Sequence, residues 1–180
     1  SGKFFDLESI NNLVIIIIAV FSALTCSTLC GLLNGFLIAK LSIPPILTTL
    51  GTMILYTGMG MALTNGESVR VGISSFAKLG SKTLFDIPYI FIMLVITFFV
   101  IFFILSKTKF GREIYMVGQN PVALKFSGRD PEKTLIKAYT LIGFLVGISS
   151  LIIVSRVNSA RMGFGDTYQL QAILVAVLGG

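Results

Sequence analysis

Hydrophobic residues in this sequence gather in long uninterrupted runs. Four of these runs contain no Lys, Arg, Asp or Glu, and a helix that spans a bilayer needs about 20 mainly apolar residues. The pattern therefore predicts four membrane-spanning helices, at about 13–39, 46–63, 88–105 and 138–155. A fifth uncharged run, 167–180, reaches only about 20 Å as a helix, short of a hydrocarbon core about 30 Å thick, so it predicts the start of a further span.

The fold class that follows is all-α: a polytopic bundle of helices in a membrane, with four complete spans and a truncated fifth. Because the chain opens on Ser1 rather than Met and its last apolar run is short, we expect residues 1–180 to be a partial transmembrane domain of a longer polypeptide. A signal peptide is not favoured, since the first run is too long and no basic cluster precedes it.

Composition excludes several other classes. With 54% apolar and 12% charged residues, the chain has too little charge to cover the surface of a soluble domain. Its net charge of +6 does not indicate nucleic-acid binding, because basic residues beside membrane spans report topology. The chain has no His, and Cys26 and Cys30 lie in the first span as small apolar residues, so neither a metal site nor an enzyme active site is predicted.

The basic residues predict the orientation. Residues 106–137 hold seven Lys and Arg, against three in 64–87 and two in 156–167. The loop richest in positive charge stays in the cytoplasm. We therefore expect 106–137 and Lys40 inside, and the other two segments outside, with Asn65-Gly66 as a turn at the start of the outer loop.

Small residues within the spans predict where helices approach closely. Pairs four residues apart, which occupy one helix face, are Gly31 with Gly35 and Gly143 with Gly147. The second helix, which begins after Pro44-Pro45, is dense in Gly and Thr and is expected to be buried among other helices. The third span is apolar all round and is expected to face lipid.

The basic loop, 106–137, contains the start and stop signals of a short helix. Asn120 can cap the free N–H groups, Pro121 suits the first helical position, and Gly128 can adopt the left-handed conformation that ends a helix. Asp130-Pro131 then repeats the start signal for the fourth span. A helix of two turns needs outside contacts, so Val122, Ala123 and Phe126 require cover, either from the membrane surface or from a cytoplasmic partner.

Three stretches resemble one transporter family. Residues 110–128 (FGREIYMVGQNPVALKFSG) are similar to the characteristic loop of the ribose- and other monosaccharide-type ABC permeases of bacteria. Residues 34–51, from Asn-Gly through Pro-Pro to Gly, and residues 155–180, from Ser-Arg to the final Gly-Gly, match the same family in the same order. Gln169 and Gln171 depart from its pattern, which has acidic residues there, as does Arg161-Met162, so the solute is left open.

The resemblance implies a multi-pass permease of the bacterial inner membrane that works as a homodimer or heterodimer. Its loop helix would dock on a cytoplasmic ATP-binding subunit, while an extracytoplasmic solute-binding protein delivers the solute. ATP and Mg would be used by that partner, since this chain lacks the phosphate-binding motif and is expected to bind no cofactor of its own. The coupling residues implied are Gly111, Arg112, Asn120, Pro121, Val122, Ala123, Phe126, Ser127 and Gly128.

The expected cargo is a monosaccharide or related neutral polar solute; a nucleoside or furanosyl signalling molecule is the alternative within the same family. Neutral hydrogen-bonding side chains suit such a path, and the candidates are Asn34, Thr48, Thr49 and Thr52, for each of which helix packing is the competing interpretation. A secondary transporter or channel independent of ATP is the alternative of another class. A charged residue inside a span would favour this alternative, and the four predicted spans contain none.

Overall fold

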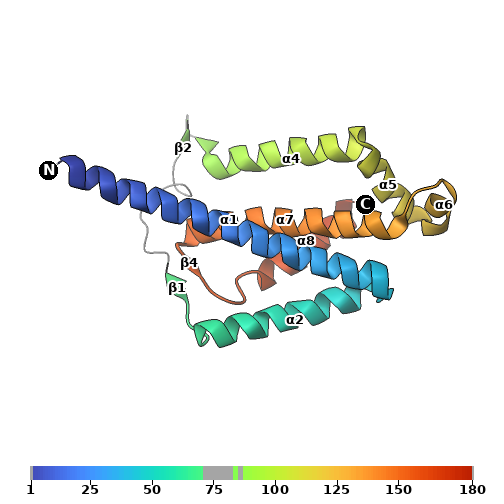
Figure 1. Cartoon of the computed structure of the whole chain (residues 1–180), viewed down its shortest axis with the longest axis horizontal. Helices are drawn as coiled ribbons and strands as arrows, with labels where there is room; N and C mark the ends of the chain where they lie inside the picture. The colour runs from blue at the N-terminus through green and yellow to red at the C-terminus, as the bar shows by residue number, and fades with distance from the viewer. Residues whose placement is uncertain (1, 71–82, 85–86, 180) are drawn as a thin grey trace.

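The computed structural model describes residues 2–70, 83–84 and 87–179 of the chain (Figure 1). Their elements, in chain order, are α1 (Gly2–Leu41), α2 (Pro45–Thr64), β1 (Val69–Arg70), β2 (Thr83–Leu84), β3 (Ile87–Pro88), α4 (Tyr89–Lys107), α5 (Lys109–Gln119), α6 (Pro121–Phe126), α7 (Pro131–Val157), β4 (Ser159–Ala160) and α8 (Asp166–Gly179). The predicted all-α membrane fold is confirmed: α1, α2, α4 and α7 are each long and apolar enough to span a bilayer.

The tightest packing in the bundle is between α1 and α7, which cross at their glycines. The backbones meet so closely that a Cβ added to Gly31 would lie 2.8 Å from the Cα atom of Gly143 and 2.5 Å from the carbonyl oxygen of Tyr139. A Cβ added to Gly35 would lie 3.0 Å from the Cα atom of Ile136. Glycine permits this approach because it has no side chain to separate two backbones.

Helix α2 contacts α1 and, at Gly60, the side chain of Met162 from the segment after α7. It begins at Pro45 and ends at Asn65, whose left-handed φ of 50° stops the helix at the predicted Asn-Gly turn. The expectation that this helix is buried among others is wrong for the described residues, in which only Thr48 of α2 is buried. The physical reason is the lack of neighbours: a Cβ on Gly51 or Gly58 would meet nothing within 4 Å.

Helix α4 has no buried residue, as expected of a lipid-facing span. It continues through a bend at Thr108 into α5, a helix the sequence reading did not identify. The bend is tight, because a Cβ on Gly111 would collide with the backbone of Leu105. The Thr108 hydroxyl accepts a hydrogen bond from the Gly111 N–H at 3.2 Å and so caps the new helix.

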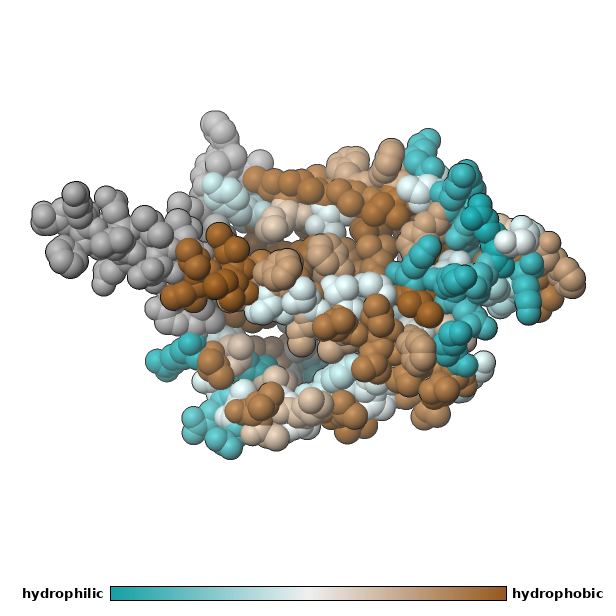
Figure 2. All heavy atoms as spheres, in the orientation of Figure 1, coloured by the Kyte–Doolittle hydropathy of each residue, from teal (hydrophilic) through white to brown (hydrophobic). Residues whose placement is uncertain are grey.

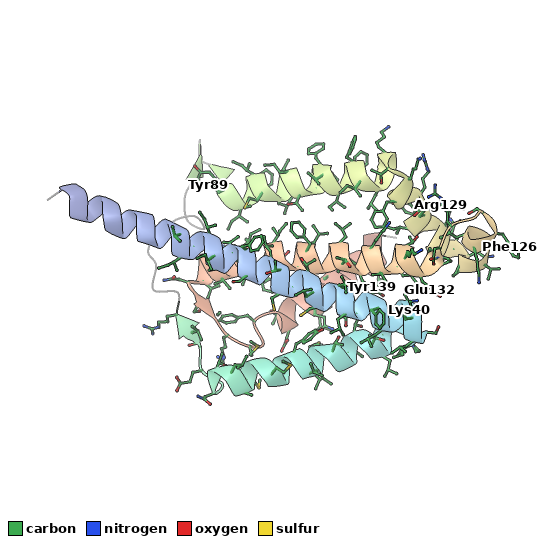
Figure 3. All side chains as sticks on the ribbon, in the orientation of Figure 1. Lys40, Tyr89, Phe126, Arg129, Glu132 and Tyr139 are labelled. Carbon is green, nitrogen blue, oxygen red and sulfur yellow. The ribbon has the colours of Figure 1, made fainter. Side chains whose placement is uncertain are left out.

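Two short strand pairs lie at the end of the bundle away from the α4–α5 bend. β1 pairs with β4 in antiparallel register, Val69 opposite Ala160, and joins the segment after α2 to the segment after α7. β2 and β3 form the second pair. The opposite end carries α5, α6 and the first turns of α7 (Figure 1), together with Lys40 at the end of α1 (Figure 3), and we call it the α6 end.

Candidate functional site

Helix α6 is built between two side-chain caps. The Asn120 side-chain oxygen accepts hydrogen bonds from the N–H groups of Val122 at 2.9 Å and Ala123 at 3.2 Å, and Pro121 fills the first helical position. Gly128 follows with a left-handed φ of 77°, and Asp130 caps α7 by accepting from the Glu132 N–H at 3.1 Å. Two helices, α6 and α7, thus begin within eleven residues, and each begins at a proline that follows a capping Asn or Asp.

One side of α6 is anchored and the other is free. Leu124 is only 1% exposed and is the largest fully buried side chain among the described residues, whereas Phe126 is 89% exposed and Val122 is 59% exposed. Figure 3 shows Phe126 at the tip of the α6 end, pointing away from the bundle. The sequence predicted that Val122, Ala123 and Phe126 would need to be covered by other residues. In the structure the bundle buries Leu124 instead. Its signal was its apolar character in a helix too short to stand alone.

A polar bridge fixes the segment after α6 to its neighbours. Arg129 Nη1 lies 3.3 Å from Glu113 Oε1 on α5. The hydroxyl of Thr134, buried in the first turn of α7, donates to Glu113 Oε2 at 3.4 Å and to the Asp130 carbonyl at 3.1 Å. Glu113 therefore links α5, the α6–α7 turn and α7. The sequence reading did not name it, because nothing local shows that residues 21 positions apart meet.

Two further ion pairs lie at this end. Lys40 Nζ is 3.6 Å from Glu132 Oε2, which joins the end of α1 to the start of α7. Lys133 Nζ is 3.2 Å from Asp130 Oδ2, and the hydrogen bond from the Lys133 side chain lowers the pKa of the Asp130 carboxyl. Figure 2 shows a dense group of hydrophilic residues over the α6 end, next to the brown surface of the spans.

A groove of about 570 Å³ opens between the end of α1 and the α6–α7 turn. Ala39 and Ser42 line one side, and Val122, Lys125 and Arg129 lie among the residues of the other. Val122, an exposed apolar side chain of α6, thus shares this groove with the charged residues Lys125 and Arg129. Of the other candidate coupling residues, Gly111 forms the α4–α5 bend, and the Ser127 hydroxyl donates to the Leu124 carbonyl at 2.7 Å.

The proposed path residues do not share one environment. Thr48 and Thr52 lie four residues apart on one face of α2 and are buried and half-buried, but Thr49 is exposed on another face. The threonine hydroxyls all donate to carbonyls of their own helix, from Thr49 to Pro45 at 2.9 Å, from Thr52 to Thr48 at 3.0 Å and from Thr48 to Pro44 at 3.3 Å.

Asn34 differs from the threonines. Its side-chain oxygen is buried and has no hydrogen-bond partner among the described residues, and the Tyr56 hydroxyl on α2 is in the same condition. Tyr56 lies beside Cys30, one turn from Asn34 on α1. The α1–α2 contact thus contains two buried polar atoms without a hydrogen-bond partner among the described residues. The sequence predicted Asn34 as a path residue but not Tyr56. Tyr56 follows Thr48 and Thr52 at the same four-residue spacing, and that spacing could have identified it. No group of metal ligands occurs in the described part of the chain.

The chain is similar to known import permeases. The chain is 35% identical over 161 residues to the ribose import permease of Haemophilus influenzae, covering 87% of this chain and 50% of that protein. It is 34% identical over 178 residues to the galactose/methyl galactoside import permease of Escherichia coli K12, covering 93% and 51%. It is 30% identical over 169 residues to the autoinducer 2 import permease of Yersinia enterocolitica, covering 91% and 51%.

The chain therefore spans about half the length of the curated relatives it matches. No solved structure matches it significantly. The profile of one permease family matches residues 2–180, nearly the whole chain. The chain is a multi-pass protein of the bacterial inner membrane, and it belongs to the family described as the branched-chain amino acid transport system / permease component.

Proposed function

We propose that this chain forms part of the permease of an ATP-driven importer that carries a monosaccharide or a related neutral polar solute. Support comes from relatives named for the import of ribose, galactose and methyl galactoside, which match most of this chain. A furanosyl signalling molecule is the alternative cargo, because one relative is named for the import of autoinducer 2. The described spans contain no charged residue at their centres, which fits a neutral solute.

The ATP-binding subunit docks on α6, with the α6 end in the cytoplasm. One observation carries this proposal: Phe126 is 89% exposed on a helix whose Leu124 is 1% exposed. A free helix of six residues would not be stable, so α6 depends on the burial of Leu124 against the bundle. The aromatic side chain of Phe126 nevertheless remains exposed. Buried aromatic residues supply much of the binding energy at protein interfaces.

Force applied to α6 reaches the membrane through α7. The Asp130 cap and the Glu113 bridge connect the α6 turn to the first turn of α7, a continuous helix from Pro131 to Val157. Because α7 packs backbone to backbone on α1 at Gly31 and Gly143, movement of α7 displaces α1 with it. Hydrolysis of ATP, with its Mg, takes place on the partner, and this chain transmits the resulting movement.

The solute passes along the polar α1–α2 contact, where Asn34 presents an oxygen without a partner. A second permease subunit, identical or not, completes the path, and a solute-binding protein docks at the end opposite α6. Thr49, exposed on a separate face, is the weakest of the four path candidates. A hydroxyl that donates to a carbonyl of its own helix can still accept a hydrogen bond from a passing solute, because donating the O–H leaves the lone pairs of the oxygen unused.

The direct test is the variant Phe126→Asp in the assembled transporter. We expect stimulation of ATP hydrolysis by solute-loaded binding protein to fall about tenfold or more, since the aromatic side chain that the ATP-binding subunit would bury is lost. Phe126→Leu, which keeps an apolar contact, is the matched control and should retain most of the stimulation. Normal uptake by Phe126→Asp would refute α6 docking, and uptake that stops on collapse of an ion gradient but persists without the ATP-binding subunit would identify a secondary transporter.

A further inference from the structure

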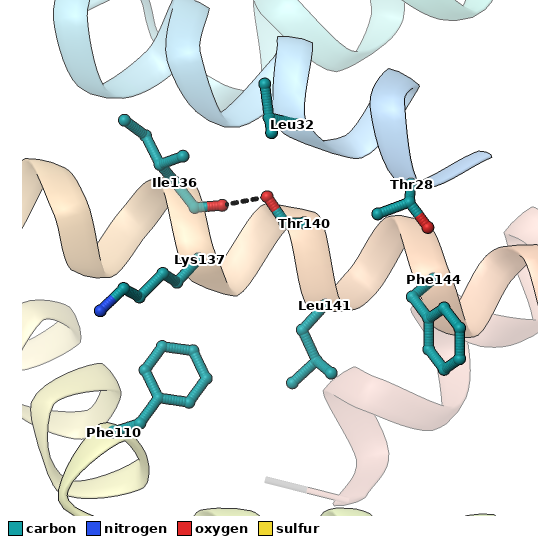
Figure 4. Close-up of a pocket in the computed structure, with 8 residues that line it drawn as sticks. All are labelled: Thr28, Leu32, Phe110, Ile136, Lys137, Thr140, Leu141 and Phe144. Atoms are coloured by element: carbon teal, nitrogen blue, oxygen red, sulfur yellow. Dashed lines mark hydrogen bonds between the residues drawn. The ribbon is translucent and has the colours of Figure 1, made fainter. Parts of the chain in front are cut away.

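An apolar groove of about 580 Å³ opens on the surface of the bundle near the α6 end (Figure 4). Leu32 of α1, Phe110 of α5 and Leu141 and Phe144 of α7 form its walls. It is separate from the Asn34 side of α1, because Leu32 lies on another face of that helix. Leu32 and Phe144 are 44% and 41% exposed, so the groove is open to its surroundings rather than closed over by the described residues.

The lining of the groove is almost entirely apolar. Both threonines in its lining turn their hydroxyls back into their own helices: Thr140 donates to the Ile136 carbonyl at 2.7 Å, and Thr28 donates to the Leu24 carbonyl at 2.6 Å. The dashed line in Figure 4 marks the first of these bonds. The occupant must therefore present a hydrocarbon surface along most of its length.

A single cation stands at the groove. The lining includes Lys137 and no carboxylate, and Lys137 forms no ion pair within the part of the chain that the structure describes. In Figure 4 its ammonium group extends past Phe110, away from Leu141 and Phe144. Lys133, one turn earlier on α7, is by contrast neutralised by Asp130 at 3.2 Å.

From this arrangement we propose that the groove is a binding site for an anionic phospholipid. One acyl chain lies between Leu32, Leu141 and Phe144, and the headgroup phosphate pairs with Lys137. The apolar walls alone would not select one lipid over another, because the surrounding lipid tails are as apolar as leucine. Selection comes from the unpaired Lys137, since one Lys near a membrane surface favours anionic headgroups about fivefold. The proposal rests on membrane location alone and is independent of the transport cargo.

Lipid retention tests the headgroup contact. The full-length permease, purified in detergent with equal amounts of phosphatidylglycerol and phosphatidylethanolamine, is stripped stepwise and analysed by native mass spectrometry. We expect retention of phosphatidylglycerol about fivefold above phosphatidylethanolamine. Lys137→Gln should remove this preference, Lys137→Arg should keep it, and the matched control Lys133→Gln should leave it unchanged. A preference that survives in Lys137→Gln, or that falls equally in Lys133→Gln, overturns the proposal.

A second measurement asks whether the groove is occupied by a lipid or by a helix of the longer protein. Tryptophan replaces Leu141 in the wall, and its added fluorescence is measured in vesicles that contain phosphatidylglycerol with brominated acyl chains. Stronger quenching than with brominated phosphatidylethanolamine is the expected result, and adding Lys137→Gln should equalise the two. Absence of quenching by either lipid would show that protein covers the groove and would overturn the proposal.

Discussion

Arg129, the residue just after the α6 turn, is held against Glu113 of α5 by a contact of 3.3 Å between Arg129 Nη1 and Glu113 Oε1. The Glu113 side chain is only 17% exposed, while that of Arg129 is 53% exposed. The second carboxylate oxygen of Glu113 accepts from the buried Thr134 hydroxyl. The position of the proposed docking helix is therefore set by its neighbours as well as by its own caps.

A double-mutant cycle on Glu113 and Arg129 measures that contact. Glu113→Gln and Arg129→Gln should each destabilise the purified protein, and the two changes together should cost less than their sum by about 1 kcal/mol or less, because one partner is half-exposed. Chemical unfolding in detergent gives the four free energies of unfolding, for the parent protein, the two single variants and the double variant. Strict additivity would show that the two side chains do not interact in the folded protein.

The α1–α7 crossing predicts opposite outcomes for two Gly→Ala changes. Gly31→Ala places a methyl group 2.5 Å from the Tyr139 carbonyl oxygen, so the helices must separate, and we expect a loss of about 1–3 kcal/mol. Gly51→Ala meets nothing within 4 Å and should be neutral or stabilising by up to about 1 kcal/mol, from helix propensity. Thermal unfolding of both variants tests this, and equal shifts would contradict the close crossing.

Asp130 makes the start of α7 sensitive to acid. Its pKa lies below the ordinary value of 3.8 in the folded protein, so its ionised form stabilises the cap above that value, and the stabilisation is lost as pH falls through the lowered pKa. We expect protection of the Glu132 and Lys133 amides against hydrogen exchange, measured relative to the unfolded chain at the same pH, to fall below about pH 4. Asp130→Asn, which can still cap, should remove this pH dependence; an unchanged profile in that variant would contradict the assignment.

The path proposal distinguishes Asn34 from Thr49. Asn34→Leu removes an oxygen that has no partner in the described structure, so folding should be unaffected or slightly stabilised, while uptake should fall about two- to tenfold through one lost neutral hydrogen bond. Thr49→Val, on the exposed face, should leave uptake unchanged. Radiolabelled ribose uptake, normalised to the amount of permease in the membrane, checks both. Normal uptake by Asn34→Leu would assign this residue to packing.

The spans were predictable because charge is excluded from hydrocarbon, and the helix ends because Asn120, Pro121 and Gly128 act locally. The Asp130-Pro131 signal likewise predicted that the last full helix begins ahead of its apolar run, and the structure begins that helix at Pro131. Helix α5 was missed because its charged residues resembled a loop. Phe110, Ile114 and Val117 nonetheless follow the spacing of an amphipathic helix.

The functional contacts that depend on tertiary structure could not be predicted. Glu113 reaches Arg129 and Thr134 only after α5 and α7 fold side by side, and the burial of Leu124 rather than Phe126 depends on how α6 rotates against its neighbours. Within the sequence alone, Val122, Ala123, Leu124 and Phe126 are equivalent apolar residues. The rotation of α6 decides which of them anchors the helix and which remains available to a partner.

Cysteine labelling at position 126 tests the proposed location and role of α6 together. Phe126→Cys is introduced into the transporter with Cys26, Cys30 and any other cysteine replaced, and a membrane-impermeant maleimide is applied to intact cells and to inverted vesicles. We expect labelling only in inverted vesicles, and protection from it when the ATP-binding subunit is present. Labelling from the outside of intact cells would contradict a cytoplasmic α6, and equal labelling with and without the ATP-binding subunit would contradict docking there.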